Sequence, residues 1–153
     1  MSTIETKLAE LGVTLPDAPA PAANYVPFVQ SGNLVHVSGQ ISNGPDGLIK
    51  GRLGDSMSVD DGAKAAKTCA IALLAQLKAA CGGDIDRLVR VVKLNAFVAS
   101  APDFHDQPKV VNGASDFLVE ALGDIGRHAR SAVGVAALPL GVAVEIDAVF
   151  EIA

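Results

Sequence analysis

The segment from Ser58 to Gly83 restricts the possible folds more than any other part of this chain. Ser58 stands where a helix N-cap is expected, Asp61 completes a capping box, and Gly82-Gly83 end the helix. Small and apolar residues between these signals recur at intervals of three and four, namely Ala63, Ala66, Ala70, Leu73, Leu74, Leu77 and Cys81. The segment therefore predicts a long amphipathic helix with one buried face.

Two further stretches have helical spacing. Residues 107–122 predict a second helix that ends at Gly123, with its inward face formed by Val110, Ala114, Phe117, Leu118 and Ala121. Residues 2–12 form a short amphipathic patch, in which Ile4, Leu8 and Leu11 share one side and Gly12 is the end signal.

Strands are predicted from alternating, Val-rich segments, which are residues 25–30, 34–41, 88–100, 130–135 and 142–148. The first two form a hairpin around the turn at residues 31–33, and Pro27 marks an edge or a bulge. A glycine-rich loop at residues 42–56 has room for one short strand. The last two strands are expected to join through a tight Pro/Gly connection at residues 138–141.

The order of these elements predicts an α+β fold, in which two helices pack on one face of a mixed sheet. A length of 153 residues fits a single domain over residues 1–153. Within it, residues 1–23 form an N-terminal extension that ends in a Pro/Ala tether, and residues 24–153 form the folded part.

Composition disfavours two classes of partner. The net charge is −5, no basic run occurs, and aromatics make up 4% of the residues, so nucleic acid is not expected to bind. No apolar run is long enough to span a membrane and the N-terminus lacks a signal-peptide pattern, so we expect a cytoplasmic protein. The mean hydropathy of +0.37 favours self-association. Cys69 and Cys81 have no metal-binding spacing and are expected to be buried.

Arg130 and Glu145 are the charged residues most indicative of chemistry. Arg130 is a permanent cation at the start of a strand, followed on the same face by the small residues Ala132 and Gly134. With the connection centred near residues 139–140, Glu145 falls opposite Gly134, so that the two charges flank a cavity for a small carboxylate. The alternative is a structural ion pair between the two strands, and the residues alone leave both interpretations open.

Several short motifs, in this order, resemble the reactive-intermediate deaminase family, also called Rid or YjgF, which has a chorismate-mutase-like fold. The resemblance extends from about residue 25 to residue 153. The matching motifs are Tyr25 with Val29-Gln30, Ser38-Gly39-Gln40-Ile41, Val111-Asn112, Ala129-Arg130-Ser131 with Val133, Leu138-Pro139 and Val144-Glu145-Ile146 with Asp147-Ala148.

The resemblance implies a homotrimer with a central barrel and clefts between neighbouring subunits. It implies hydrolysis of imines and enamines, such as 2-aminoacrylate, to a 2-oxo acid and ammonia, without a metal or an organic cofactor. In such proteins the residue matching Arg130 holds the substrate carboxylate and the residue matching Glu145 orients water. The remaining residues that line the implied cleft are Tyr25, Ser38, Gly39 and Asn112.

Two positions depart from the family pattern. Ala132 stands where a Cys is common, and Gly134 stands where an acidic residue is common. Neither change removes Arg130, so the expected binding of a carboxylate is retained. The shape of the pocket, and hence the preferred substrate, depends on both positions.

Other interpretations remain open. The same scaffold fits a non-catalytic carboxylate sensor or interaction protein, and some family members are described as ribonucleases, although the acidic charge disfavours that activity here. Asn112 on a helix is as often solvated as functional, and Tyr25 is equally suited to plain packing. His36, His105 and His128 have no metal-binding spacing, and only His128 lies close enough in sequence to Arg130 to border the cleft.

Overall fold

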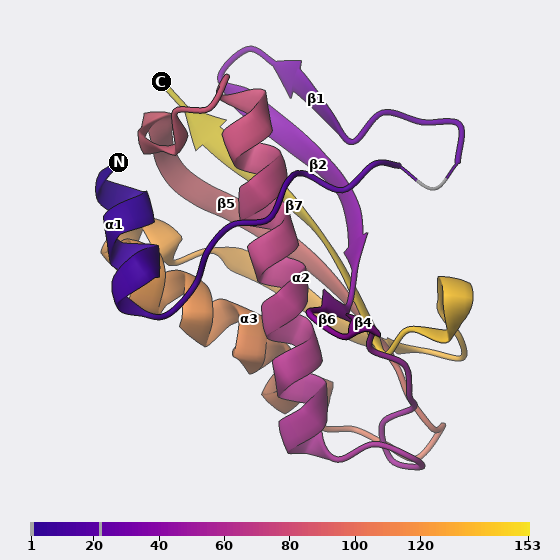
Figure 1. Cartoon of the computed structure of the whole chain (residues 1–153). Coiled ribbons are helices and arrows are strands. Elements are labelled where there is room, and N and C mark those ends of the chain that lie inside the picture. The colour runs from indigo at the N-terminus through magenta and orange to yellow at the C-terminus, as the bar shows by residue number, and fades with distance from the viewer. Residues whose placement is uncertain (1, 22) are drawn as a thin grey trace.

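A five-stranded sheet organises the computed structural model of this chain, which describes residues 2–21 and 23–153 (Figure 1). Neighbouring strands are antiparallel except β5 and β6, which run parallel, so the sheet is mixed as predicted. From edge to edge the strands are β1 (Phe28–Ser31), β2 (Leu34–Ile41), β7 (Val144–Ile152), β5 (Leu88–Ala99) and β6 (Ala129–Val135). A small separate hairpin consists of β3 (Asn43–Gly44) and β4 (Gly47–Leu48).

The predicted pairing of the last two strands is wrong. β6 and β7 are not neighbours, because β5 lies between them and pairs with both. The connection over residues 136–143 is long enough to pass across the end of β5. The middle of this connection is a single helical turn at Pro139–Gly141, in which Leu140 has φ 60°. This turn changes the direction of the chain and does not close a hairpin. A parallel β5–β6 pair needs a helical crossover, which α3 supplies.

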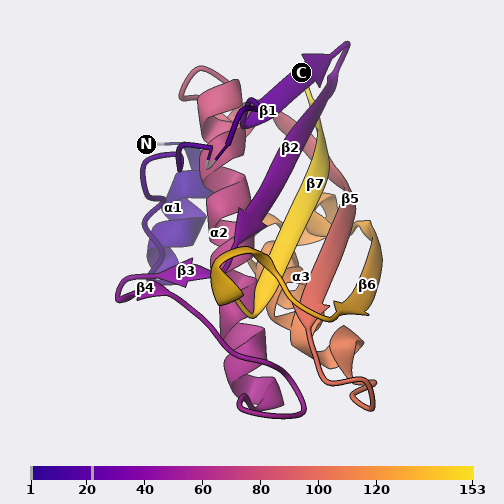
Figure 2. The ribbon, with the colours of Figure 1, turned by 90° about the vertical axis from the view of Figure 1, so that its right-hand side faces the viewer.

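Helices α2 (Val59–Ala80) and α3 (Gln107–Leu122) cover one face of the sheet, as predicted (Figure 2). α2 packs over β2 and β7, and α3 lies beside α2 and toward β5 and β6. The backbones of the two helices approach closely at Gly113, where an added Cβ would lie 2.0 Å from the carbonyl oxygen of Ala63. The inward residues predicted for α3 are all buried.

The expectation of two helices needs a correction, since the described residues form three α-helices. The additional helix, α1 (Thr3–Glu10), packs against α3 and not on the sheet. It forms because Ser2 and Glu5 make a reciprocal capping box and Ile4 and Leu8 are buried. The amphipathic spacing at residues 2–12 is the signal for this helix. Among the described residues, no helix is long and apolar enough to cross a membrane.

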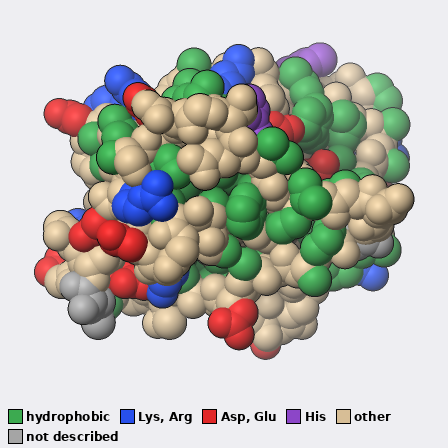
Figure 3. Space-filling view, turned by 90° about the horizontal axis from the view of Figure 1, so that it is seen from above, with side chains coloured by type: hydrophobic (Ala, Val, Ile, Leu, Met, Phe, Trp, Pro, Cys, Tyr) green, Lys and Arg blue, Asp and Glu red, His purple; other side chains and the backbone are tan. Residues whose placement is uncertain are grey.

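The face of the sheet opposite the helices is open. Residues that pair across neighbouring strands point to the same face, and along β7 buried residues alternate with half-buried ones. The half-buried set includes Glu145, whose row continues through Phe97 to Val133. In the view from above, hydrophobic side chains gather on the side of the molecule where the chain approaches β1 (Figure 3).

Residues 11–21 run from the end of α1 across α2 toward the end of β2 (Figure 1). Gln76 of α2 donates a hydrogen bond from Nε2 to the carbonyl oxygen of Pro19 at 2.7 Å, which ties this segment to the helix layer. β1 begins at Phe28, three residues later than predicted, because Pro27 lacks the N–H that strand pairing requires. Tyr25 therefore lies outside the strand.

Candidate substrate-binding site

Glu145 is a half-buried carboxylate on the open face of the sheet. Burial raises its pKa, and the nearby negative charge of Asp147 raises it further. Asp147 is itself held by a hydrogen bond from Asn95 Nδ2 at 2.8 Å. No hydrogen bond or ion pair to Glu145 is found within residues 2–21 and 23–153. Glu145 is therefore available to a ligand or to a water molecule.

Gly39 provides the space that Glu145 occupies. The register between β2 and β7 shifts between Val37 and Gln40, which places Gly39 in an irregular part of β2 beside Glu145. An added Cβ at Gly39 would lie 2.8 Å from Glu145 Oε2 and 3.0 Å from Cδ. The glycine is needed here for its lack of a side chain, and the structure brings the two predicted residues together.

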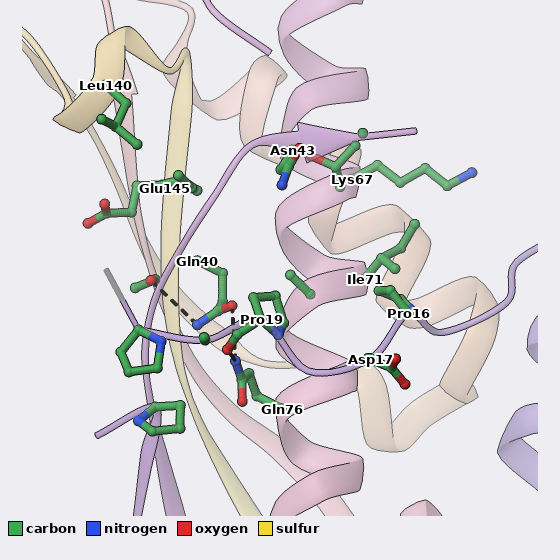
Figure 4. A pocket seen from close by; sticks show the side chains of 18 of the residues that line it. Pro16, Asp17, Pro19, Gln40, Asn43, Lys67, Ile71, Gln76, Leu140 and Glu145 are labelled. Atoms are coloured by element: carbon green, nitrogen blue, oxygen red, sulfur yellow. Dashed lines mark hydrogen bonds between the residues drawn. The ribbon is translucent and has the colours of Figure 1, made fainter. Parts of the chain in front are cut away.

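A cavity of about 1010 Å³ surrounds this carboxylate and continues around the edge of β2 (Figure 4). The Glu145 carboxylate points away from α2, whereas Gln40 on the same wall points toward Gln76 of α2. The tether supplies a second wall that is largely apolar, and Leu140 supplies another. Glu145 is thus one of the residues that line a larger cavity.

Tyr25 belongs to the wall of the same cavity, and Ser38 contacts the neighbouring residue Val26. Tyr25 lines the cavity and its side chain is 46% exposed. Ser38 donates a hydrogen bond from Oγ to the carbonyl oxygen of Val26 at 2.8 Å, next to Tyr25 in the chain. The Ser38 hydroxyl therefore holds the segment that presents Tyr25.

Arg130 lies elsewhere in the chain, on edge strand β6. It pairs with Leu94 of β5, which is buried under the helices, so its side chain starts from the helix-covered face. The guanidinium donates from Nη1 to Ser115 Oγ at 3.0 Å and from Nη2 to the Pro108 carbonyl oxygen at 3.2 Å. Both partners belong to α3, where Asn112 is exposed one turn after Pro108.

The predicted juxtaposition of Arg130 and Glu145 within one chain is wrong. Glu145 pairs with Phe97 on one side and with Ile41 on the other, and not with Gly134. The space expected above Gly134 is also filled, since an added Cβ would lie 2.6 Å from Gln107 Nε2 and from Ser100 Oγ. The ion pair between Arg130 and Glu145 is absent from the described residues as well.

The chain therefore presents two separate half-sites. The acidic half-site consists of Glu145 on the open face together with Gly39 and Tyr25, which line the same cavity, and Ser38 holds the segment next to Tyr25. The basic half-site, at the β6 edge, consists of Arg130 with Asn112 and Ser115 of α3.

Sequence reasoning missed Ser115 as a partner of Arg130. Its spacing of three residues from Asn112, on one side of the same helix, was the available signal. In the part of the chain that the structure describes, no three His, Cys, Asp or Glu side chains gather as a metal site would require.

Comparison with known proteins points to one family. A family model described as Endoribonuclease L-PSP matches residues 15–152. Protein TCP17 of Trypanosoma cruzi is 51% identical over 97% of this chain and 94% of its own length. A 2-iminobutanoate/2-iminopropanoate deaminase of Dermatophagoides farinae is 30% identical over 90% of this chain and 92% of its own. The crystal structure of Atu1372 from Agrobacterium tumefaciens, of unknown function, has 50% identity and a TM-score of 0.91, covering 98% of this chain and 92% of that one.

Proposed function

Because the chain belongs to the L-PSP family, which is the Rid or YjgF family, we propose that it hydrolyses small imines and enamines of 2-amino acids. The products are a 2-oxo acid and ammonia. Support comes from a permanent cation suited to a carboxylate and a desolvated carboxylate suited to proton transfer, both without an ionic partner among the described residues. The similarity to a protein named as a 2-imino acid deaminase favours this chemistry over other reactions of small carboxylates.

The observation on which this proposal depends is the position of the two half-sites on opposite faces of one sheet. A single chain does not place Arg130 and Glu145 on one small substrate. We infer that the active site lies between two subunits, with the acidic half-site from one chain and the basic half-site from the next, in a homotrimer. Val29, Leu34 and Val133 support this assembly, because they are 37–53% exposed on the open face and would be covered by a neighbouring copy.

The reaction needs little more than positioning and one proton shuttle. Arg130 binds the substrate carboxylate through paired hydrogen bonds and fixes the plane of the imine. Glu145 takes a proton from a water molecule as the water oxygen bonds to the imine carbon. The same carboxyl group gives this proton to the imine nitrogen, which becomes the amino group of a carbinolamine. A second transfer through Glu145 moves the remaining hydroxyl proton to this nitrogen, and the C–N bond then breaks, so that ammonia leaves while the C=O bond forms. An enamine substrate first takes a proton on carbon to become the imine.

The raised pKa of Glu145 suits this shuttle, because a carboxyl group that holds its proton more tightly is a better base when it is ionised. Proton transfer by a positioned side chain contributes about 10²–10⁴-fold, which is enough for a substrate that water already hydrolyses unaided. The described residues therefore suffice for the proposed chemistry.

The experiment is an assay of pyruvate release from freshly generated 2-aminoacrylate, compared with release in the absence of the protein. We expect a faster release that is lost in Arg130→Ala and in Glu145→Gln. Arg127→Ala is the matched control, because Arg127 is exposed and its side chain pairs with Asp124, another surface residue, at 3.4 Å. Unchanged release with the wild-type protein would refute the deaminase proposal.

Ribonuclease activity is the second candidate, because the description of the matching family model names an endoribonuclease. The net charge of −5 disfavours it, since binding to a phosphate backbone normally depends on a basic surface. Incubation of the same preparations with RNA decides between the two: cleavage that is abolished in Arg130→Ala and accompanied by no imine hydrolysis would favour the ribonuclease.

A further inference from the structure

The guanidinium of Arg130 is one end of a hydrogen-bond chain that links strand β6 to helix α3 and to the turn before β6. Arg130 Nη1 lies 3.0 Å from Ser115 Oγ, and Ser115 Oγ lies 2.8 Å from His128 Nε2. The other ring nitrogen, His128 Nδ1, lies 2.6 Å from the carbonyl oxygen of Gly126. Three elements are thus joined in series: strand β6, helix α3 and the turn at residues 123–126 that precedes β6.

The direction of each hydrogen bond in this chain follows from the chemistry of its two ends. The Gly126 carbonyl oxygen can only accept, so His128 Nδ1 must be the protonated nitrogen. In the neutral ring His128 Nε2 is then an acceptor, and the Ser115 hydroxyl must donate to it. The lone pairs of Ser115 Oγ are consequently directed at the cation, and they accept from Arg130 Nη1. Every donor in this chain therefore faces an acceptor, and the assignment contains no conflict.

The neutral state of His128 that this direction requires is favoured by its surroundings. Burial lowers the pKa of the half-buried His128 ring, and the positive charge of Arg130 lowers it further, whereas the Gly126 carbonyl acts in the opposite sense. His128 therefore remains an acceptor near neutral pH.

The hydrogen bonds to α3 use only some of the N–H donors of the guanidinium, so the others are available to a ligand. An arginine has five N–H donors, of which the structure uses one on Nη1 and one on Nη2. Within residues 2–21 and 23–153 three donors remain without a partner, enough for paired contacts with a carboxylate. A long side chain on an edge strand would otherwise sample many rotamers, and the two contacts to α3 restrict it before a ligand arrives.

From this geometry we propose that Ser115 and His128 are positioning residues, which fix the Arg130 guanidinium in the orientation that receives the substrate carboxylate. This inference rests on the proposed function, because it assumes that Arg130 binds the carboxylate of the substrate. Neither residue contacts the reacting atoms. Their loss therefore affects the capture of the carboxylate more than the chemical step.

The test measures KM and kcat for imine hydrolysis, together with the Kd of 2-oxobutanoate by calorimetry. Ser115→Ala and His128→Phe are each expected to raise KM and Kd about tenfold, which corresponds to the middle of the range of coupling free energies between residues in contact. The value of kcat should change less than about threefold. Ser115→Thr keeps the hydroxyl group and should restore values close to wild type. Glu120→Ala, an exposed change on the same helix, is the control for effects on α3 itself.

A double-mutant cycle separates positioning from a general structural role. When Arg130 is already replaced by Ala, the further change Ser115→Ala should leave the Kd of 2-oxobutanoate unaltered, because the group that Ser115 holds is gone. An equal loss in both backgrounds would overturn the proposal, as would wild-type KM and Kd in Ser115→Ala or His128→Phe. If instead Arg130→Ala alone binds 2-oxobutanoate like the wild type, it is the carboxylate-binding role in the proposed function that fails.

If Ser115→Ala does not fold, the pair His128→Phe and His128→Gln gives the same information. His128→Gln retains an acceptor that reaches toward Ser115, so it should bind 2-oxobutanoate more tightly than His128→Phe. Equal binding by these two variants would contradict the hydrogen-bond chain.

Discussion

Arg130 and Glu145 lie on opposite faces of the same sheet, with strand β5 between their strands. The row of paired residues through Arg130 continues to Leu94 and Ala148, which are buried under the helices. Glu145 belongs to a different row and faces away from the helices. A substrate of a few atoms does not bridge a sheet, so a site that uses both residues requires two chains.

Subunit mixing tests this arrangement directly. Arg130→Ala and Glu145→Gln are each expected to lose most activity, and Arg130→Ala to weaken carboxylate binding about 10- to 100-fold, the range for a charge-assisted hydrogen bond. In the homotrimer that we propose, unfolding the two inactive proteins together and refolding them gives mixed assemblies, in which some clefts combine an intact Arg130 with an intact Glu145. Activity should then return to a fraction of the wild-type value.

The control for mixing is each variant refolded with itself, which should stay inactive. If both residues served one site within one chain, every site in a mixed assembly would lack one of them. Absence of recovery, in mixtures shown by native mass spectrometry to contain both chains, would contradict a site shared between subunits.

The helices could be predicted from the sequence because their signals are local. The bounds of α3 at residues 107–122 follow from apolar spacing and from Gly123, which adopts φ 69° at the helix end. The partner of β6 could not be predicted, since pairing with β5 or β7 depends on the path of a crossover and not on residues near β6. The same error misplaced Glu145 relative to Gly134, because a residue's face and neighbour depend on the strand order.

The candidate site shows the same division between local and long-range information. The residue types of the family motif identify Gly39 and Glu145, but their contact arises from a shift in the β2–β7 register that no sequence pattern reveals. Ser115 was missed for a related reason, since its role depends on where the side chain of Arg130 crosses the edge of α3.

Gly39→Ala is expected to reduce activity about tenfold or more while the protein stays folded. The new methyl group would lie 2.8 Å from Glu145 Oε2, so the carboxylate must rotate away from its position. Misplacing a catalytic group by about 1 Å lowers the rate by up to 10²-fold. We therefore expect a clear fall in kcat, while the melting temperature stays close to that of the wild type. Gly44→Ala is the matched control, since its nearest contact would be an ordinary 3.5 Å to Ile49 Cδ1. Similar kcat values for the two variants would contradict a role for the space at Gly39.

Gly113→Ala is expected to destabilise the fold. The added Cβ would lie 2.0 Å from the Ala63 carbonyl oxygen, and this backbone atom cannot move aside without separating α2 from α3. Overpacking of this kind costs about 1–3 kcal/mol, and a change of 1 kcal/mol shifts the melting temperature of a domain this size by about 2–4 °C. Calorimetry on Gly113→Ala and on the exposed control Glu120→Ala measures the difference. Equal melting temperatures would show that the helices do not meet at this residue.

Glu145→Gln should raise stability at neutral pH even though it removes activity. The pKa of Glu145 is raised above its ordinary value of 4.5 by burial and by Asp147, so the folded protein binds this proton more tightly than the unfolded chain does. The stabilisation from the bound proton is complete below pH about 4.5 and is lost as the pH rises through the higher pKa of the folded state. At pH 7 the ionised carboxylate is a net cost, and Gln removes it.

The corresponding measurement is the melting temperature of both proteins between pH 4 and pH 8. The advantage of Glu145→Gln should be absent at the acid end and should grow with pH. In the assembled cleft the Arg130 guanidinium of a neighbouring subunit would favour the charged carboxylate and oppose this shift. The advantage at neutral pH should therefore be larger when both proteins also carry Arg130→Ala. An advantage that is independent of pH would mean that Gln stabilises through packing and that the titration of Glu145 is not coupled to folding.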